Sequence, residues 1–254
     1  GEVRDGADRL YAEMLKSRLL GENPCDVDRL FRRIKQFGHH ARQAGGVCGI
    51  ELALWDLAGK AYGTPVYQML GGCFRDRVRI YCDTDVRGRA SGQAMGEALK
   101  KRLEMGFTFL KMDVGINLLR GVEGALTAPL GFLDEFYGAV RHPEASLPAD
   151  ERRRLRNRWY DLNNIAHPFT GIRVTEKGLD YLEQYVSEVR GVIGYDVPLA
   201  TDHFGHIGIE DCIKIARRLD QFNLAWYEDM LPWQYTAQYV RLAQSCTTPL
   251  CTGE

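Results

Sequence analysis

Three acidic residues each close a short apolar run, and they recur at one spacing. Asp202 ends the run LATD, Glu228 ends the run AWYE, and Glu254 ends the run LCTGE. Both intervals are 26 residues, which is enough for one helix and one strand. Parallel strands at such intervals would bring the three carboxylates to one edge of a sheet, since neighbouring strands lie only about 4.8 Å apart.

Carboxylates held this close repel one another, and a bound cation offsets that cost. A hard ion such as Mg²⁺ prefers oxygen ligands and leaves positions open for a substrate. Each acid taken alone could instead cap the helix that follows it. Because three acids share one spacing after apolar runs, we predict a Mg²⁺ site at Asp202, Glu228 and Glu254, with Mn²⁺ as an alternative ion.

The elements that would position these acids alternate from residue 78 onward. Short β-prone runs are separated by segments with apolar residues at helical spacing, which predicts βα units around a parallel sheet. An open doubly wound sheet and part of a (β/α) barrel both fit this pattern. We expect strands at 78–82, 108–112, 198–201, 224–227 and 249–251, and helices at 94–103, 179–193, 209–219 and 236–243.

Residues 1–65 read as helical instead. Asp26 is placed to cap a second helix. The third helix, 47–62, is apolar over most of its surface, so we expect it to be buried between others.

The alternation is interrupted at about 116–171, which is too long for an ordinary βα loop. The interruption follows a strand, so it should emerge on the face where barrels carry their active sites. Its basic run could form a lid that recognises a carboxylate, but a solvated helix face is the favoured interpretation. The run consists of Arg152, Arg153, Arg154, Arg156 and Arg158.

Composition limits the partners. The formal net charge is −1, which argues against strong attraction to nucleic acid or to an anionic membrane. We find neither a run long enough to span a membrane nor a signal peptide. The seven cysteines lack a C-x-x-C pair, as expected for reduced thiols in a cytoplasmic protein. Neither end resembles a natural terminus, so we expect a segment of a longer protein.

Four segments give the sequence a family resemblance. The segment GIELALWDLAGK at 49–60 and the segment PVYQMLGG at 65–72 resemble the mandelate racemase/muconate lactonizing enzyme branch of the enolase superfamily. Tyr227-Glu228-Asp229 and Thr252-Gly253-Glu254 resemble it as well. The resemblance implies an α+β capping domain on a modified (β/α)₇β barrel. Residues 1–75 would be the helical part of the cap, and 76–254 the first five βα units with the insertion at 116–171.

The resemblance also implies a reaction. In this family an Asp, a Glu and a Glu at successive strand ends bind Mg²⁺, which matches Asp202, Glu228 and Glu254. The ion supports abstraction of the proton α to a carboxylate through an enediolate. Lys111 matches the first lysine of the family's Lys-x-Lys motif and should assist electrostatically. Asp113 replaces the second lysine, which is usually the base, and its negative charge makes it a poor substitute.

The histidines beside Asp202 are the next catalytic candidates. His203 and His206 could protonate a leaving hydroxyl or bind a substrate hydroxyl, although either could equally be a loop residue bonded to backbone. Asp229 is expected to orient neighbours of the metal site. Trp226 and Trp233 are expected to pack in the core or at the rim. The principal acid/base could lie beyond residue 254, because relatives of the racemase type carry a His–Asp pair on later strands.

We therefore predict an acid-sugar dehydratase that forms a 2-keto-3-deoxy acid and assembles as a homo-oligomer. A racemase or epimerase of a 2-hydroxy acid is the nearest alternative, and a cycloisomerase is less favoured. A non-catalytic relative that binds sugar acids is an alternative of another class, which the loss of the second lysine at Asp113 favours. An open-sheet phosphate-binding protein is disfavoured because Cys82-Asp83-Thr84-Asp85 is not a glycine-rich loop.

Overall fold

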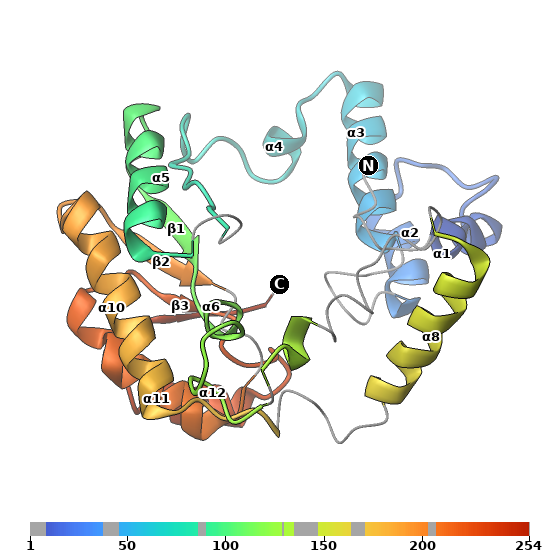
Figure 1. The fold of residues 1–254 in the computed structure, drawn as a ribbon. Helices are drawn as coiled ribbons and strands as arrows, with labels where there is room; N and C mark the ends of the chain where they lie inside the picture. Colours follow the sequence, from blue (N-terminus) through green and yellow to red (C-terminus); the bar gives the residue numbers. More distant parts are fainter. Residues whose placement is uncertain are drawn as a thin grey trace. The chain divides into compact units, whose positions relative to one another are not determined.

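The computed structural model (Figure 1) describes residues 9–37, 46–85, 90–128, 130–134, 147–163, 171–202 and 207–253. The chain divides into two units, residues 1–79 and residues 80–253. Each unit is described on its own below.

The first unit is helical in its described part. Two clusters of buried side chains hold it together, one around Leu15, Ile34 and Val47 and the other around Leu30 and Ala58. Gly63 ends the longest helix in the left-handed conformation that glycine adopts most easily. The elements are α1 (Arg9–Met14), η1 (Leu15–Arg18), α2 (Val27–Ile34), η2 (Lys35–Phe37), α3 (Val47–Tyr62) and α4 (Val66–Met69).

Two expectations about this unit need correction. Asp26 does precede α2, but its side chain makes no capping hydrogen bond; its carboxylate pairs instead with Arg29 at 2.9 Å. Helix α3 has the predicted bounds, yet it is not buried on all sides. Leu52 is 59% exposed and Leu57 is 49% exposed, because the described helices of this unit cover only the face that carries Leu54 and Ala58.

The second unit alternates helices with short parallel strands. Two of its long helices begin at the hydroxyl residues expected of helix caps. The Ser91 hydroxyl accepts from the Ala94 backbone N–H, and the Thr175 hydroxyl accepts from that of Gly178. The elements are α5 (Gly92–Glu104), β1 (Leu110–Asp113), α6 (Ile116–Leu119), α8 (Ala149–Asn163), α10 (Glu176–Ile193), β2 (Leu199–Asp202), α11 (Ile209–Leu219), η5 (Asp220–Phe222), β3 (Tyr227–Glu228), α12 (Thr236–Ala243) and β4 (Leu250–Cys251).

The four strands pair in parallel in the order β1-β2-β3-β4, which is also their order along the chain. A doubly wound sheet reverses its order at a switch point, so this part of the sheet has the arrangement of a barrel wall. Figure 1 shows α5, α10 and α11 side by side along the strands. The strands β1 and β2 are almost entirely buried, as parallel strands usually are.

The predicted strand at 78–82 does not form. Cys82 alone makes a bridge, to Leu110, while Val78 and Ile80 are 70% and 65% exposed. The predicted 108–112 strand begins at Leu110 and continues to Asp113. The segment 78–82 has β-branched and aromatic residues, but strand propensity depends on packing against neighbours, and Val78 and Ile80 are largely exposed.

One continuous core fills the second unit. Met95 and Leu99 from α5 meet Leu182, Val186 and Val189 from α10, and α11 adds a face of similar residues. These side chains cover the strands and hold their carboxyl ends in place. No helix among the described residues has both the length and the apolar character needed to cross a membrane.

Candidate metal centre

The carboxyl ends of the four strands place polar residues in one row. Asp113 on β1 pairs in register with Asp202 on β2. Thr201 pairs with Tyr227, so Asp202 and Glu228 occupy the next position on their strands. Glu228 in turn pairs with Cys251 on β4. Residues at equivalent positions of parallel strands project to the same side, and this row therefore gathers three carboxylates and a thiol.

Lys111 joins two of these carboxylates. Its Nζ donates to Asp202 Oδ2 at 2.6 Å and to Glu228 Oε2 at 3.2 Å. All three residues are buried, with exposed fractions of 5%, 2% and 9%. Two buried negative charges so close together need a positive charge between them, and here the lysine ammonium supplies it.

The lysine remains charged in this environment. Burial by itself would lower the pKa of Lys111, but the hydrogen bond and charge of Asp202, with further attraction from Asp83 and Glu228, raise the pKa well above its ordinary value. A lysine held as an ammonium can stabilise negative charge on a substrate, but it is a poor proton acceptor at neutral pH.

An aromatic cluster lies beside these charges. The Trp226 ring stacks on Phe109 with centroids 5.0 Å apart, and Tyr81 meets Trp226 edge-on at 5.7 Å. Lys111 Nζ lies 5.3 Å from the centroid of the Tyr81 ring. The Trp226 indole N–H donates to Glu228 Oε2 at 2.9 Å, so one aromatic residue is tied directly to a site carboxylate.

The oxygen donors suit a divalent ion. Carboxylate oxygens of Asp202, Glu228 and Asp229 lie within 4.8 Å of one another, and so do those of Asp83, Asp113 and Asp202. Asp229 has a positive φ of 49°, unusual for a residue other than glycine, and it accepts from the Thr252 hydroxyl at 2.9 Å. The donors are all hard oxygens, which fits Mg²⁺ or Mn²⁺ better than a softer metal.

The structure brings together part of the predicted site. Lys111, Asp202 and Glu228 converge as described, and Asp229 lies beside them. Glu254, His203 and His206 lie outside the described residues, as do the other four histidines of the chain.

Sequence reasoning missed Tyr81, Asp83 and the polar role of Trp226. The two-residue spacing of Trp226 and Glu228 was a usable signal, since such residues face the same side of a strand.

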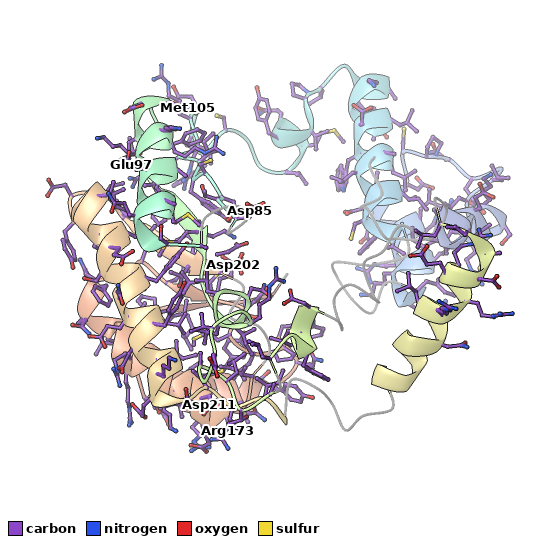
Figure 2. The ribbon with its side chains drawn as sticks, in the orientation of Figure 1. Asp85, Glu97, Met105, Arg173, Asp202 and Asp211 are labelled. Carbon is purple, nitrogen blue, oxygen red and sulfur yellow. The ribbon has the colours of Figure 1, made fainter. Side chains whose placement is uncertain are left out.

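A further buried carboxylate in this unit has a structural role. Asp211, fully buried in the first turn of α11, accepts from Arg173 Nε at 2.9 Å and from the Val174 N–H at 3.0 Å. Figure 2 shows Arg173 and Asp211 together, away from Asp202. This pair fastens the segment that follows the long insertion to α11.

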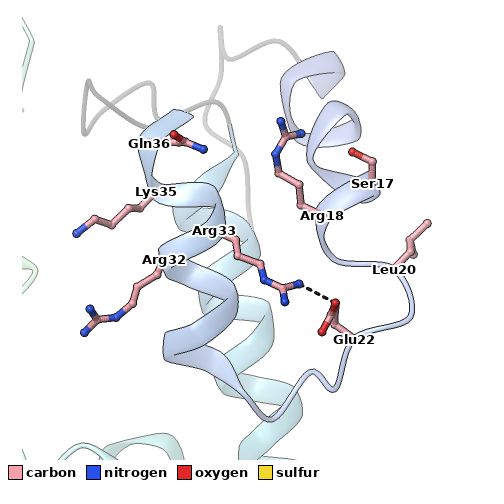
Figure 3. Close-up of a pocket in the computed structure, with 8 residues that line it drawn as sticks. All are labelled: Ser17, Arg18, Leu20, Glu22, Arg32, Arg33, Lys35 and Gln36. Atoms are coloured by element: carbon pink, nitrogen blue, oxygen red, sulfur yellow. Dashed lines mark ion pairs between the residues drawn. The ribbon is translucent and has the colours of Figure 1, made fainter.

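A wide cavity of about 680 Å³ lies in the first unit (Figure 3) and is a weaker candidate. It is basic, but two of its cations are already paired. Arg33 contacts Glu22 at 2.7 Å, and Arg32 contacts Asp28 at 2.8 Å. Because its lining is open and its charges are exposed, the cavity lacks the buried, converging groups of the strand-end row.

Two family profiles match the chain. The one described as "Enolase C-terminal domain-like" matches residues 94–254. The other, "Mandelate racemase / muconate lactonizing enzyme, N-terminal domain", matches residues 5–71. Together they take in most of both units.

Curated relatives with similar sequences carry dehydratase names. The chain is 28% identical to a D-xylonate dehydratase of Haloferax volcanii, over 98% of this chain and 51% of that protein. It is 26% identical to a D-mannonate dehydratase of Caulobacter vibrioides, over 82% of this chain and 44% of that protein. The chain thus spans about half the length of these relatives.

Solved structures share the fold. A mandelate racemase/muconate lactonizing enzyme-like protein from Rubrobacter xylanophilus matches with a TM-score of 0.68 and 28% identity, over 99% of this chain and 58% of that one. A 3,6-anhydro-D-galactonate cycloisomerase from Zobellia galactanivorans matches with a TM-score of 0.63 and 20% identity, over 96% and 52%. The likeness confirms the expected fold class, a (β/α) barrel that is partial in this chain.

Proposed function

Because the chain belongs to the mandelate racemase/muconate lactonizing enzyme family of enolase-like proteins, we propose that it supplies the metal-binding part of an acid-sugar dehydratase. The observation that carries the proposal is the buried grouping of Lys111 in β1 with Asp202 and Glu228, which end β2 and β3. The dehydratase names of the curated relatives support the choice of reaction.

Asp202, Glu228 and Glu254 are the proposed ligands of Mg²⁺, with Mn²⁺ as a possible substitute. The bound ion would supply positive charge beside the substrate carboxylate, where negative charge develops as the α-proton leaves. The support within this chain is that carboxylate oxygens of Asp202 and Glu228 lie within 4.8 Å of each other and of one from Asp229. Lys111 would share in this charge stabilisation as an ammonium, because its raised pKa keeps it protonated.

Proton transfer is assigned to other residues. His203 follows Asp202 directly and His206 lies four residues after it; both are proposed to protonate the leaving hydroxyl or to bind a substrate hydroxyl. The group that accepts the α-proton is proposed to lie beyond residue 254, where the family resemblance implies a His–Asp pair in members of the racemase type.

The proposed reaction balances as a dehydration. The α C–H bond breaks and its proton passes to the base, while the electron pair forms a double bond between the α and β carbons. The β C–O bond breaks, and the departing hydroxyl takes a proton from the acid and leaves as water. The resulting enol tautomerises to a 2-keto-3-deoxy acid.

Turnover of a library of sugar acids by the intact protein tests this proposal, with and without Mg²⁺ and with semicarbazide to trap the keto product. We expect metal-dependent signal on one or two sugar acids, and Glu228→Gln should abolish it. Proton exchange in D₂O without a keto product would indicate the racemase or epimerase alternative.

The third candidate function, after the dehydratase and the racemase or epimerase, is a barrel that binds sugar acids without turnover. Asp113 favours it, since this residue stands where the family usually has its second lysine. Metal and sugar-acid binding without dehydration or D₂O exchange would establish that reading and overturn the dehydratase.

We also propose a homo-oligomer in the cytoplasm. All seven cysteines are free, which suits a reducing compartment. Apolar side chains such as Phe74, which is 89% exposed, and Val78 suit an interface between copies. Light scattering of the intact protein measures the oligomeric state directly.

A further inference from the structure

Trp226 is bonded to the site through a single polar atom. Its Nε1–H donates to Glu228 Oε2 at 2.9 Å, and this carboxylate is one of the proposed metal ligands. The two residues lie two positions apart, so they face the same side of the extended chain. The bond joins a donor to an ionised acceptor, which makes it stronger than a bond between neutral groups.

The indole is itself held in place. Its ring stacks on Phe109 and meets Tyr81 edge-on. Its backbone carbonyl accepts from the Thr201 N–H at 3.0 Å, which ties residue 226 to the strand that carries Asp202. A ring packed against two neighbouring aromatic side chains and held at its backbone directs its N–H at one point, and that point is Glu228 Oε2.

We propose that Trp226 is a positioning residue that fixes the orientation of Glu228 for metal binding. The proposal rests on the metal site put forward above. Lys111 and Trp226 are the two described donors to Glu228, and both reach the same oxygen, Oε2. Neither of these described donors occupies Oε1, which is the oxygen proposed to face the cation.

The indole suits this role better than the lysine does. Lys111 carries a positive charge that would repel a divalent ion at close range, whereas the indole is a neutral donor that does not titrate. Trp226 therefore holds the carboxylate in both the metal-free and the metal-bound protein. Outer partners of this kind typically affect metal affinity by roughly 10–100-fold.

Trp226→Phe tests the proposal, because it keeps an aromatic ring and removes the N–H. Trp55→Phe is the matched control. Trp55 Nε1 also donates to a glutamate, Glu51 Oε1 at 3.0 Å, but it lies on α3, outside the strand-end row. Calorimetric titration of the intact protein with Mg²⁺ should show roughly 10–100-fold weaker binding for Trp226→Phe, and unchanged binding for Trp55→Phe.

Two readouts separate positioning from packing. If Trp226 only packed, its loss would lower the melting temperature of the metal-free protein and leave the Mg²⁺ affinity of the folded protein unchanged, which would overturn the proposal. In ¹⁵N-indole spectra of the wild type, the Trp226 N–H signal should shift on saturation with Mg²⁺ while the Trp55 signal stays in place. An unmoved Trp226 signal would also overturn it.

If Trp226→Phe does not fold, β-(3-benzothienyl)alanine at position 226 replaces it, since this residue keeps the shape of the indole and has sulfur in place of N–H. Weaker Mg²⁺ binding by that protein supports the proposal, and wild-type affinity refutes it. A wild-type protein that binds no Mg²⁺ would refute the metal site as well. Equal binding by wild type and variant would refute the role of Trp226 alone.

Discussion

At the scale of single residues, the site is organised by charge compensation. Asp202 and Glu228 are both buried, and an ionised carboxylate removed from water needs a partner. Lys111 serves both at once. The same ammonium that stabilises the metal-free site is therefore available to stabilise a substrate carboxylate.

Removing that ammonium should destabilise the metal-free protein. Lys111→Met leaves two buried carboxylates without a cation, and breaking a buried pair of this kind costs about 3–5 kcal/mol. Lys60→Met is the control, because its bond to Asp56 at 2.6 Å is exposed and such pairs contribute about 0–1 kcal/mol. Denaturant unfolding in EDTA measures both losses. Equal losses would contradict the role given to Lys111.

The stability lost in Lys111→Met depends on pH in a way that follows from the raised pKa of Lys111. A group whose pKa is raised on folding contributes fully below its unfolded value, about 10.4 for lysine, and its contribution fades as pH rises through the folded value. The difference between wild type and Lys111→Met should therefore be the same at pH 7 and pH 9. Unfolding curves at the two pH values check this.

The contribution of Asp220 to stability depends on pH in the opposite direction. Burial opposes its ionisation, but hydrogen bonds from Thr247 and Thr248 outweigh burial and hold the pKa of Asp220 below its ordinary value. Its contribution is present above about pH 4 and is lost as pH falls through the folded value. Asp220→Asn should cost about 1–2 kcal/mol at pH 7 and less at pH 3.5. A cost that does not change with pH would contradict this assignment.

At this scale the sequence predicted the meeting of Asp202 and Glu228 from their spacing and strand-end positions. It did not predict that Trp226 donates to Glu228, or that Tyr81 lies beside Lys111. The spacing of Trp226 and Glu228 places them on one side of the chain but does not fix the ring orientation that the hydrogen bond needs. The approach of Tyr81 to Lys111 depends on how neighbouring segments are aligned, which spacing along one chain does not contain.

At the scale of elements, helices were easier to predict than strands. Helices α3, α11 and α12 have the bounds expected from apolar spacing. Strands β3 and β4 are only two residues long, shorter than their apolar runs suggested. A helix makes its hydrogen bonds within itself, whereas a strand needs a partner whose position is set elsewhere in the chain.

The close packing of α5 on α10 depends on a small residue. A Cβ at Gly96 would lie 2.7 Å from Val192 Cβ, and overpacking of this kind costs about 1–3 kcal/mol. Gly191 on α10 is the control, because a Cβ there would meet nothing within 4 Å. Thermal unfolding should show that Gly96→Ala lowers the melting temperature. Gly191→Ala should raise it slightly, since alanine favours helix by about 1 kcal/mol. If both changes raise it, the helices are not in close contact at Gly96.

At the scale of the whole molecule, the candidate metal centre belongs to one of two units. The described residues of the strand-end row all lie between 80 and 253. In the other unit, α2 and α3 pack against each other in two clusters of their own. From the sequence we expect the change from helical residues to alternating strands and helices at about residue 76, because the segment around Val78 has the composition of a strand. In the structure the two units divide between residues 79 and 80, and Val78 is largely exposed.

This division predicts where Mg²⁺ stabilises the molecule. A ligand that binds only the folded form at 100 times its Kd adds about 2.7 kcal/mol, which should slow by about 100-fold the hydrogen exchange of amides that open only by unfolding of that unit. In the intact protein, amides of α10 and α11 should slow on addition of Mg²⁺, while those of α2 and α3 should keep their rates. Glu228→Gln should remove the effect. Equal slowing in both units would mean that they unfold together, and no slowing in α10 and α11 would refute the metal centre at Asp202 and Glu228.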